Sequence, residues 1–248
     1  MSESIKITDF KNKYKNKRIF IIGNGPSLNK TDLNLIKNEY SIAMNRISQI
    51  YNSTNWRPSF FVCTTSNISD SQWKKDILET VDTGVPTFIW DQLAEHFRGY
   101  DHIFPMVCTN GMERSENPPI EWWSYDINER VTKFGTSMIV ALQIAVYMGF
   151  KEIYIVGADL GFQKSMLQKI LYRLRLNKLA HLLDKNHFSG SYGTPGAGAD
   201  SLNKNMVAAH KLTKRACDKC GVKVFNATVG GSLEVYNRID FSKIQTKK

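Results

Sequence analysis

The chain has 248 residues, of which 42% are hydrophobic and 23% are charged, proportions that are typical of a globular protein and exclude disorder over the whole length. Its net charge of +10 favours anionic ligands such as nucleotides, nucleic acids or acidic lipids. The longest nearly apolar run, residues 138–150, is too short to span a bilayer. The chain begins without the apolar core of a signal peptide, and four cysteines do not make a disulfide framework. We therefore expect a cytoplasmic protein.

Short runs of β-branched and aromatic residues alternate with helical segments along the chain. Several runs are apolar on both faces, which is typical of strands in a buried parallel sheet. Strands are predicted at residues 18–23, 40–44, 59–63, 86–90, 103–107, 151–157 and 222–225. Helices are predicted at residues 33–36, 71–83, 137–148, 164–183 and 202–220, and an irregular loop at residues 109–130. The alternation indicates an α/β fold with a Rossmann-like, mostly parallel, doubly wound sheet.

No internal repeat or shift in composition divides the chain, so we expect a single domain at residues 18–241. We expect residues 1–17 to form a polar tail or helix and residues 242–248 to form a short tail. Residues 164–185 hold six cations and one acid, with apolar residues at helical spacing. We interpret this basic segment as an insertion before the final helix and strand. One interpretation is that it forms a surface helix that binds anionic lipid.

The first predicted strand runs directly into a glycine-containing turn. Ligands of open α/β sheets bind beyond the carboxyl ends of the strands, where small residues let the backbone approach a phosphate or ribose. The turn lacks the spacing of a dinucleotide fingerprint, since residue 28 is leucine, and it lacks the lysine of a phosphate-binding P-loop. We predict a nucleotide contact here, the alternative being a tight turn alone. The residues concerned are Gly23, Asn24, Gly25, Pro26 and Ser27.

Other polar residues occupy equivalent positions in the predicted fold. Asn45 follows the second strand, and Asp159 lies just beyond the strand at residues 151–157, at the end of Gly157-Ala-Asp159. Thr136 and Ser137 open the long apolar helix, where hydroxyls and free backbone N–H groups form an anion site. Each also has a purely structural interpretation, as an N-cap or a turn residue.

His187 is a candidate catalytic base, and the sequence lacks the usual metal-binding motifs. His187 lies beside a glycine-rich loop, and a histidine there can act as a general base near neutral pH or simply hold the loop. The Cys217-x-x-Cys220 pair has no second pair and no nearby histidine, so we predict no zinc site. The sequence contains no Asp-x-Asp, which counts against a metal-dependent sugar transferase.

Taken together, these stretches resemble two related families. One is the group of bacterial sialyltransferases of glycosyltransferase family 42. The other is the MptE-like domain family, which is named for an archaeal 6-hydroxymethylpterin diphosphokinase and also occurs in flagellin-glycosylation and surface-polysaccharide proteins. The resemblance spans residues 18–241 and is carried by residues 23–28, Asn45, Thr136, Ser137 and residues 148–159. Residues 186–188, 225–228, 233–236 and Arg238 are more similar to the MptE-like group.

The sialyltransferase resemblance implies roles for particular residues. Asn24, Asn45, Thr136 and Ser137 would contact the CMP part of a donor, and residues 163–185 would form a lid over the site. Thr64 or Thr65 stands where a further donor-binding asparagine occurs in that family. Ser191 stands where its catalytic histidine occurs, which leaves His187 as the candidate base.

The leading functional hypothesis is therefore transfer of an acidic nonulosonate sugar from a CMP donor to a glycan acceptor in surface glycan synthesis, with no metal required. One alternative is a diphosphokinase that uses ATP and Mg²⁺ on a pterin or similar alcohol, with Asp159 as a candidate metal ligand. Another is a non-catalytic module that associates with phosphates or with the inner membrane face through residues 164–185. The expected partners are a nucleotide or nucleotide sugar, a glycan acceptor and a second copy of the chain, but not nucleic acid.

Overall fold

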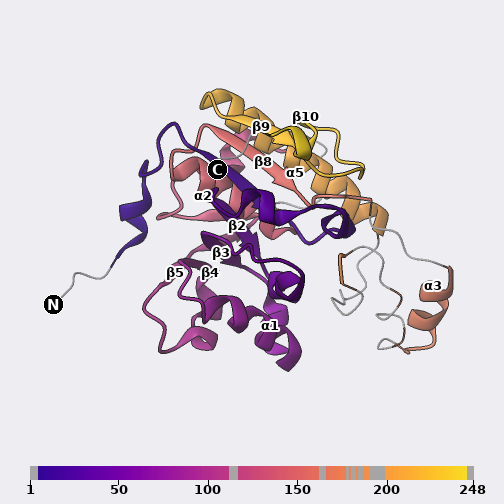
Figure 1. Ribbon diagram of the computed structural model, residues 1–248. Helices are drawn as coiled ribbons and strands as arrows, with labels where there is room; N and C mark the ends of the chain where they lie inside the picture. Colours follow the sequence, from indigo (N-terminus) through magenta and orange to yellow (C-terminus); the bar gives the residue numbers. More distant parts are fainter. Residues whose placement is uncertain are drawn as a thin grey trace.

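A parallel eight-stranded sheet forms the centre of the computed structural model, which describes residues 5–111, 117–161, 166–176, 179, 183, 187–189 and 199–244. Its strands are β1 (Arg18–Ile22), β2 (Ser41–Met44), β3 (Phe60–Cys63), β4 (Thr87–Trp90), β5 (Ile103–Met106), β8 (Glu152–Val156), β9 (Lys223–Asn226) and β10 (Asn237–Arg238). They lie in the order β10-β9-β8-β1-β2-β3-β4-β5, and every neighbouring pair is parallel (Figure 1). The predicted parallel α/β fold is confirmed.

Helices cover the sheet on both faces. The α-helices are α1 (Ser71–Val81), α2 (Ser137–Tyr147), α3 (Met166–Arg173) and α5 (Ala199–Lys219). Short 3-10 helices span Ile7–Phe10, Pro26–Lys30, Leu33–Ile36, Ile47–Ser53, Ser66–Ser69, Asp91–Phe97, Ile120–Trp122 and Phe241–Lys243. None of the described helices is both long and apolar enough to cross a bilayer.

Alternation along β1 shows why the sheet is doubly wound. Ile19 and Ile21 point into one hydrophobic cluster with α2 and α5, whereas Phe20 and Ile22 point into a second cluster with α1. Side chains of successive strand residues face opposite sides of a sheet, so a strand that is apolar throughout needs cover on both sides. This is the physical basis of the continuous apolar runs in the sequence.

Helix α2 is buried around almost its whole circumference, because the sheet lies on one side and α5 and β7 (Val131–Lys133) lie on others. Its one strongly polar interior residue, Gln143, is fully hydrogen-bonded. The Gln143 carboxamide oxygen accepts from the backbone N–H groups of Ser124 and Thr132 at 3.2 and 3.1 Å. Its nitrogen donates to the carbonyls of Thr132 and Ile139 at 2.9 and 3.1 Å. These bonds remove the cost of burying the amide and fix β7 to the helix.

Two local expectations differ from the structure. The segment predicted as an irregular loop holds most of β6 (Cys108–Asn110), which pairs in parallel with β7 in a separate two-stranded sheet. Neither three-residue strand shows a period that a sequence pattern could detect. Residues 5–17, within the expected polar tail or helix, include the 3-10 helix Ile7–Phe10 and are anchored to the domain, because Phe10 is buried and Tyr14 stacks on Phe150 with ring centroids 5.0 Å apart.

The strand order creates a switch point beside β1. From β1 the chain moves outward through β2, β3, β4 and β5, and it then returns to place β8 on the other side of β1. The carboxyl ends of β1 and β8 therefore border the crevice where ligands bind in open α/β sheets. The glycine turn that follows β1 lies at this point.

Candidate functional site

The ends of β1 and β8 approach each other so closely that only glycine fits. The N–H of Gly25 donates to the carbonyl oxygen of Gly157 at 2.9 Å. A Cβ on Gly23 would lie 2.5 Å from that same oxygen, and a Cβ on Gly157, whose φ is +70°, would lie 2.7 Å from the Gly23 carbonyl oxygen. The glycines of the predicted turn are thus required by backbone packing in addition to any contact with a ligand.

Asp159 links the end of β8 to the turn after β1. Its carboxylate accepts the Ser27 hydroxyl at 2.7 Å and the Ser27 N–H at 3.2 and 3.3 Å. Burial raises the pKa of this carboxyl above its usual value, and the bonds from Ser27 act in the opposite direction. Two predicted residues that are 132 positions apart in the chain are therefore joined directly. Ser27 and Asp159 bind each other in the structure. Their predicted contact with a nucleotide stays a prediction.

A second polar cluster lies at the start of α2. The Thr64 hydroxyl, at the end of β3, lies 2.9 Å from the Ser137 hydroxyl, and the Ser137 hydroxyl donates to the Asn45 side-chain oxygen at 3.4 Å. The Thr136 hydroxyl accepts from the Met138 N–H at 3.2 Å and caps the helix. Residues at the ends of β2 and β3 therefore meet the amino end of α2. An uncharged polar cluster at a helix start can receive an anion.

Asn24 connects the two clusters. Its side-chain amide donates to the Met44 carbonyl at 2.9 Å, directly before Asn45 in the chain. Asn45 itself has a left-handed backbone with φ of 53°, a conformation that asparagine tolerates better than most residues. A Cβ on Gly23 would also lie 2.7 Å from the methyl carbon of Met138, so α2 begins beside the glycine turn.

The segment containing His187 lies against the same turn. The Phe188 N–H donates to the Asn24 carbonyl at 3.0 Å, and the Asn29 side chain donates to the Phe188 carbonyl at 2.8 Å. His187 is half-buried. The structure thus brings the candidate base beside the first glycine turn, whereas Ser191 lies outside the described residues. Its catalytic role stays a prediction.

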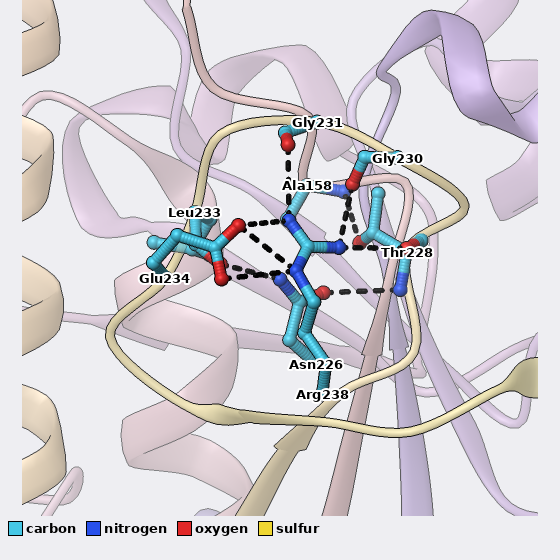
Figure 2. A network of polar contacts seen from close by, with 8 residues as sticks. All are labelled: Ala158, Asn226, Thr228, Gly230, Gly231, Leu233, Glu234 and Arg238. Atoms are coloured by element: carbon cyan, nitrogen blue, oxygen red, sulfur yellow. Dashed lines mark hydrogen bonds and ion pairs between the residues drawn. The ribbon is translucent and has the colours of Figure 1, made fainter.

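Arg238 holds the loop after β9 through several hydrogen bonds, an arrangement that we call the arginine clasp (Figure 2). The sequence alone did not assign this clasp to the site. The Arg238 guanidinium pairs with the Glu234 carboxylate at 2.6 to 3.0 Å. It also donates to the carbonyls of Thr228, Gly230 and Gly231 at 3.2, 2.7 and 3.0 Å. Such a fork of donors fixes several acceptors at once, so one side chain shapes the whole loop.

The clasped loop reaches Asp159. The Asn226 amide donates to the Leu233 carbonyl at 2.6 Å, and the Thr228 hydroxyl accepts from the Ala158 N–H at 3.1 Å (Figure 2). The Ser232 N–H then donates to the Asp159 carbonyl at 2.6 Å. The signal in the sequence was the Gly230-Gly231 pair, and both glycines have left-handed φ values of 75° and 74°. The loop therefore forms a wall next to the end of β8.

In the part of the chain that the structure describes, no three histidine, cysteine, aspartate or glutamate residues form a group able to hold a metal ion. Cys217 is buried, and burial raises the pKa of its thiol to about 12, so it stays protonated at neutral pH.

The sequence profile of the 6-hydroxymethylpterin diphosphokinase MptE-like family matches residues 1–165. The chain belongs to this family. The match contains every predicted nucleotide-binding residue, whereas His187 and the clasped loop of this MptE-like chain lie beyond it. A search among curated proteins finds no match.

Among solved structures, the fold of this MptE-like chain is similar to that of the MAf glycosyltransferase from Magnetospirillum magneticum AMB-1. The TM-score is 0.57 at 13% sequence identity. The similarity covers 98% of this chain but only 39% of that protein. At this level of identity the likeness shows a shared fold.

Proposed function

We propose that the crevice between the two polar clusters binds a nucleotide, and that the chain transfers an acidic sugar of the nonulosonate class from a CMP-linked donor to a glycan acceptor. The observation that carries this proposal is the meeting of Thr64, Asn45 and Ser137 at the amino end of α2. The similar fold of a protein named as a glycosyltransferase supports the reaction class. The sugar and nucleotide classes rest on the sialyltransferase resemblance of the sequence.

In this reaction the bond between the anomeric carbon and the phosphate oxygen breaks, and the leaving nucleotide gains negative charge. The positive end of the α2 dipole and the hydroxyls at its start would stabilise that charge without a metal. The acceptor hydroxyl forms the new bond to the anomeric carbon, and His187 takes its proton. Replacing His187 by asparagine should lower kcat by about 10²–10⁴-fold while leaving nucleotide affinity nearly unchanged. A stable variant with full turnover would rule out this role.

The direct test is calorimetry with CMP in the presence of EDTA. We expect binding to the full chain, and we expect Ser137→Ala to weaken it by about tenfold, the effect of losing one hydrogen bond to a charged group. Ser48→Ala is the matched control, because the buried Ser48 hydroxyl donates to the Asp76 carbonyl at 2.7 Å, beneath α1. Its CMP affinity should equal that of the wild type.

The family description favours one second candidate, a diphosphokinase that uses ATP and Mg²⁺. Magnesium prefers carboxylate oxygens together with water. Of the residues described at the crevice, Asp159 supplies the carboxylate, and Ser27 already donates two hydrogen bonds to it. The residues present therefore fit this ion poorly. No heat with CMP, but clear heat with ATP and Mg²⁺, would favour the diphosphokinase.

We also propose that residues 163–185 close over the crevice when the nucleotide binds. Much of this segment lies outside the described residues, but α3 falls within it. Lids of this kind exclude water and complete a site on closure. Trypsin cleavage after Arg173 or Arg175 should become slower when CMP is bound. Cleavage at the same rate with and without CMP would contradict closure.

A further inference from the structure

Helix α3 presents a row of large apolar side chains to solvent. Met166, Ile170 and Leu174 are 81%, 46% and 62% exposed. Their spacing of four residues places them on one side of a helix, and Leu167, at 54% exposed, widens the same side. Leu174 directly follows α3, and its N–H donates to the Ile170 carbonyl at 2.9 Å, which continues the last turn. We call these four residues the outer face of α3. The helix stands to one side of the domain, away from the central sheet (Figure 1).

This exposure is concentrated in α3 and the residues that directly follow it. Of the eleven large hydrophobic residues that are exposed in the described part of the chain, six lie between residues 166 and 179. On the other side of the same helix, Gln168 and Leu171 are buried. Among its described residues, the helix therefore has one buried side and one exposed outer face. Contiguous exposed apolar surface of this kind marks a site of contact with a membrane or a protein.

Charge distinguishes between these possible partners. Arg173 and Arg175 are exposed beside the outer face, and residues 164–185 hold six cations against one acid. A second copy of the chain packed face to face would bring these cations together in a poorly hydrated contact, which is unfavourable. An anionic bilayer accepts both features, since apolar side chains enter the acyl boundary while arginine side chains extend to the headgroups.

We propose that the outer face of α3 binds the surface of an anionic lipid bilayer, with the helix lying in the plane of the interface. The inference does not depend on the proposed transferase activity, because it concerns the exposed side of α3 and its test needs no nucleotide. It also does not depend on whether the segment that contains α3 closes over the crevice.

The experiment is co-sedimentation of the full chain with vesicles. One set consists of phosphatidylcholine alone, and the other is an equal mixture of phosphatidylcholine and phosphatidylglycerol. We expect strong partitioning only to the anionic set, weakened by added salt. The double variant Arg173→Gln, Arg175→Gln should partition roughly 30-fold more weakly, from the loss of two cations near the surface. The double variant Ile170→Ser, Leu174→Ser should also lose at least tenfold.

Two matched controls separate the effect of α3 from that of the whole molecule. Lys74→Gln with Lys75→Gln removes the same charge from exposed positions on α1, and Leu35→Ser removes an apolar side chain that is 48% exposed elsewhere. Both should bind as the wild type does. Equal partitioning to both vesicle sets, or α3 variants that bind like the wild type, would overturn the proposal. Self-association that requires Leu174, without vesicle binding, would instead assign the face to a second copy.

Discussion

Gly25 is the position at which the crevice has the least space. A Cβ added there would overlap the Asp159 carboxylate and would lie 2.7 Å from the Gly157 carbonyl oxygen. Its backbone is ordinary, with φ of −71°, so the constraint is steric and not conformational. A side chain at this position would push apart the ends of β1 and β8.

We therefore expect Gly25→Ala to lower the free energy of unfolding by about 1–3 kcal/mol, the usual cost of overpacking, as measured by urea unfolding. In an Asp159→Ala background the same change should cost less, because one of the two overlapping groups is gone. Part of the cost should persist, since the Gly157 carbonyl remains. An equal cost in both backgrounds would show that the carboxylate is not the group that excludes a side chain.

Asp159 should also impose a pH dependence on stability. Burial raises the pKa of its carboxyl above the usual 3.8, so the folded chain binds more protons than the unfolded chain between these two pKa values. The contribution of Asp159 to stability is then greatest below pH 3.8 and is lost as the pH rises to the raised value. Asp159→Asn, whose amide oxygen can still accept from Ser27, should be free of this loss.

Urea unfolding of wild type and variant across that pH range is the measurement, and the stability of Asp159→Asn relative to wild type should increase as the pH rises. Asp240→Asn is a control of opposite sign, because hydrogen bonds from Ser242 lower the pKa of Asp240. The stability of the wild type relative to Asp240→Asn should decrease as the pH falls through the lowered pKa of Asp240. A constant difference for Asp159→Asn would show that its carboxyl has the same pKa in both states.

At the scale of elements, the Arg238 clasp decides the position of the loop between β9 and β10. Exposed ion pairs such as that of Arg238 with Glu234 add little stability by themselves. The three loop carbonyls that the guanidinium also binds give the clasp its structural effect. Lysine keeps the charge but cannot reproduce this fork.

We expect Arg238→Lys to lower global stability by only about 1 kcal/mol and to raise hydrogen exchange of the Ser232 N–H by about tenfold. That N–H donates to the Asp159 carbonyl, so its exchange reports whether the loop leaves the crevice. Arg98→Lys is the matched control, since Arg98 forms an exposed pair with Glu95 at 2.8 Å. Unchanged protection of Ser232 in Arg238→Lys would mean that the loop holds its position without the clasp.

At the scale of the whole molecule, the sheet extends beyond the segment that matches the family profile. β9 pairs with β8, and α5 packs against α2, although both follow residue 165. A chain ending at residue 165 would expose the backbone edge of β8 and part of the apolar surface of α2. Uncovered edges of this kind promote aggregation.

We expect that shortened chain to aggregate and to lack a cooperative unfolding transition, as followed by size-exclusion chromatography and circular dichroism. A chain ending at residue 244 should behave as the full chain does, since Phe241 and Ile244 remain in the core. A soluble, cooperatively folded 165-residue chain would show that β9 and α5 are dispensable for the fold.

Several features could be predicted from the sequence because they depend on residues close together in the chain. The apolar run of β1, the glycine turn that follows it and the cap at Thr136 are local patterns, and the structure shows all three. The parallel class of the sheet followed from the alternation of buried strands with helices. In each case the physical cause, such as strand burial or a helix start, acts over a few residues.

Only the tertiary structure decided which of these features meet. The return of the chain to place β8 beside β1 joins Asp159 to Ser27, and the end of β3 brings Thr64 to Ser137. The clasp of Arg238 around its loop likewise depends on β10 adding to the sheet edge. Side chains far apart in sequence gain contact only through the order of strands, which is selected by packing of the whole core and leaves no local pattern in the sequence.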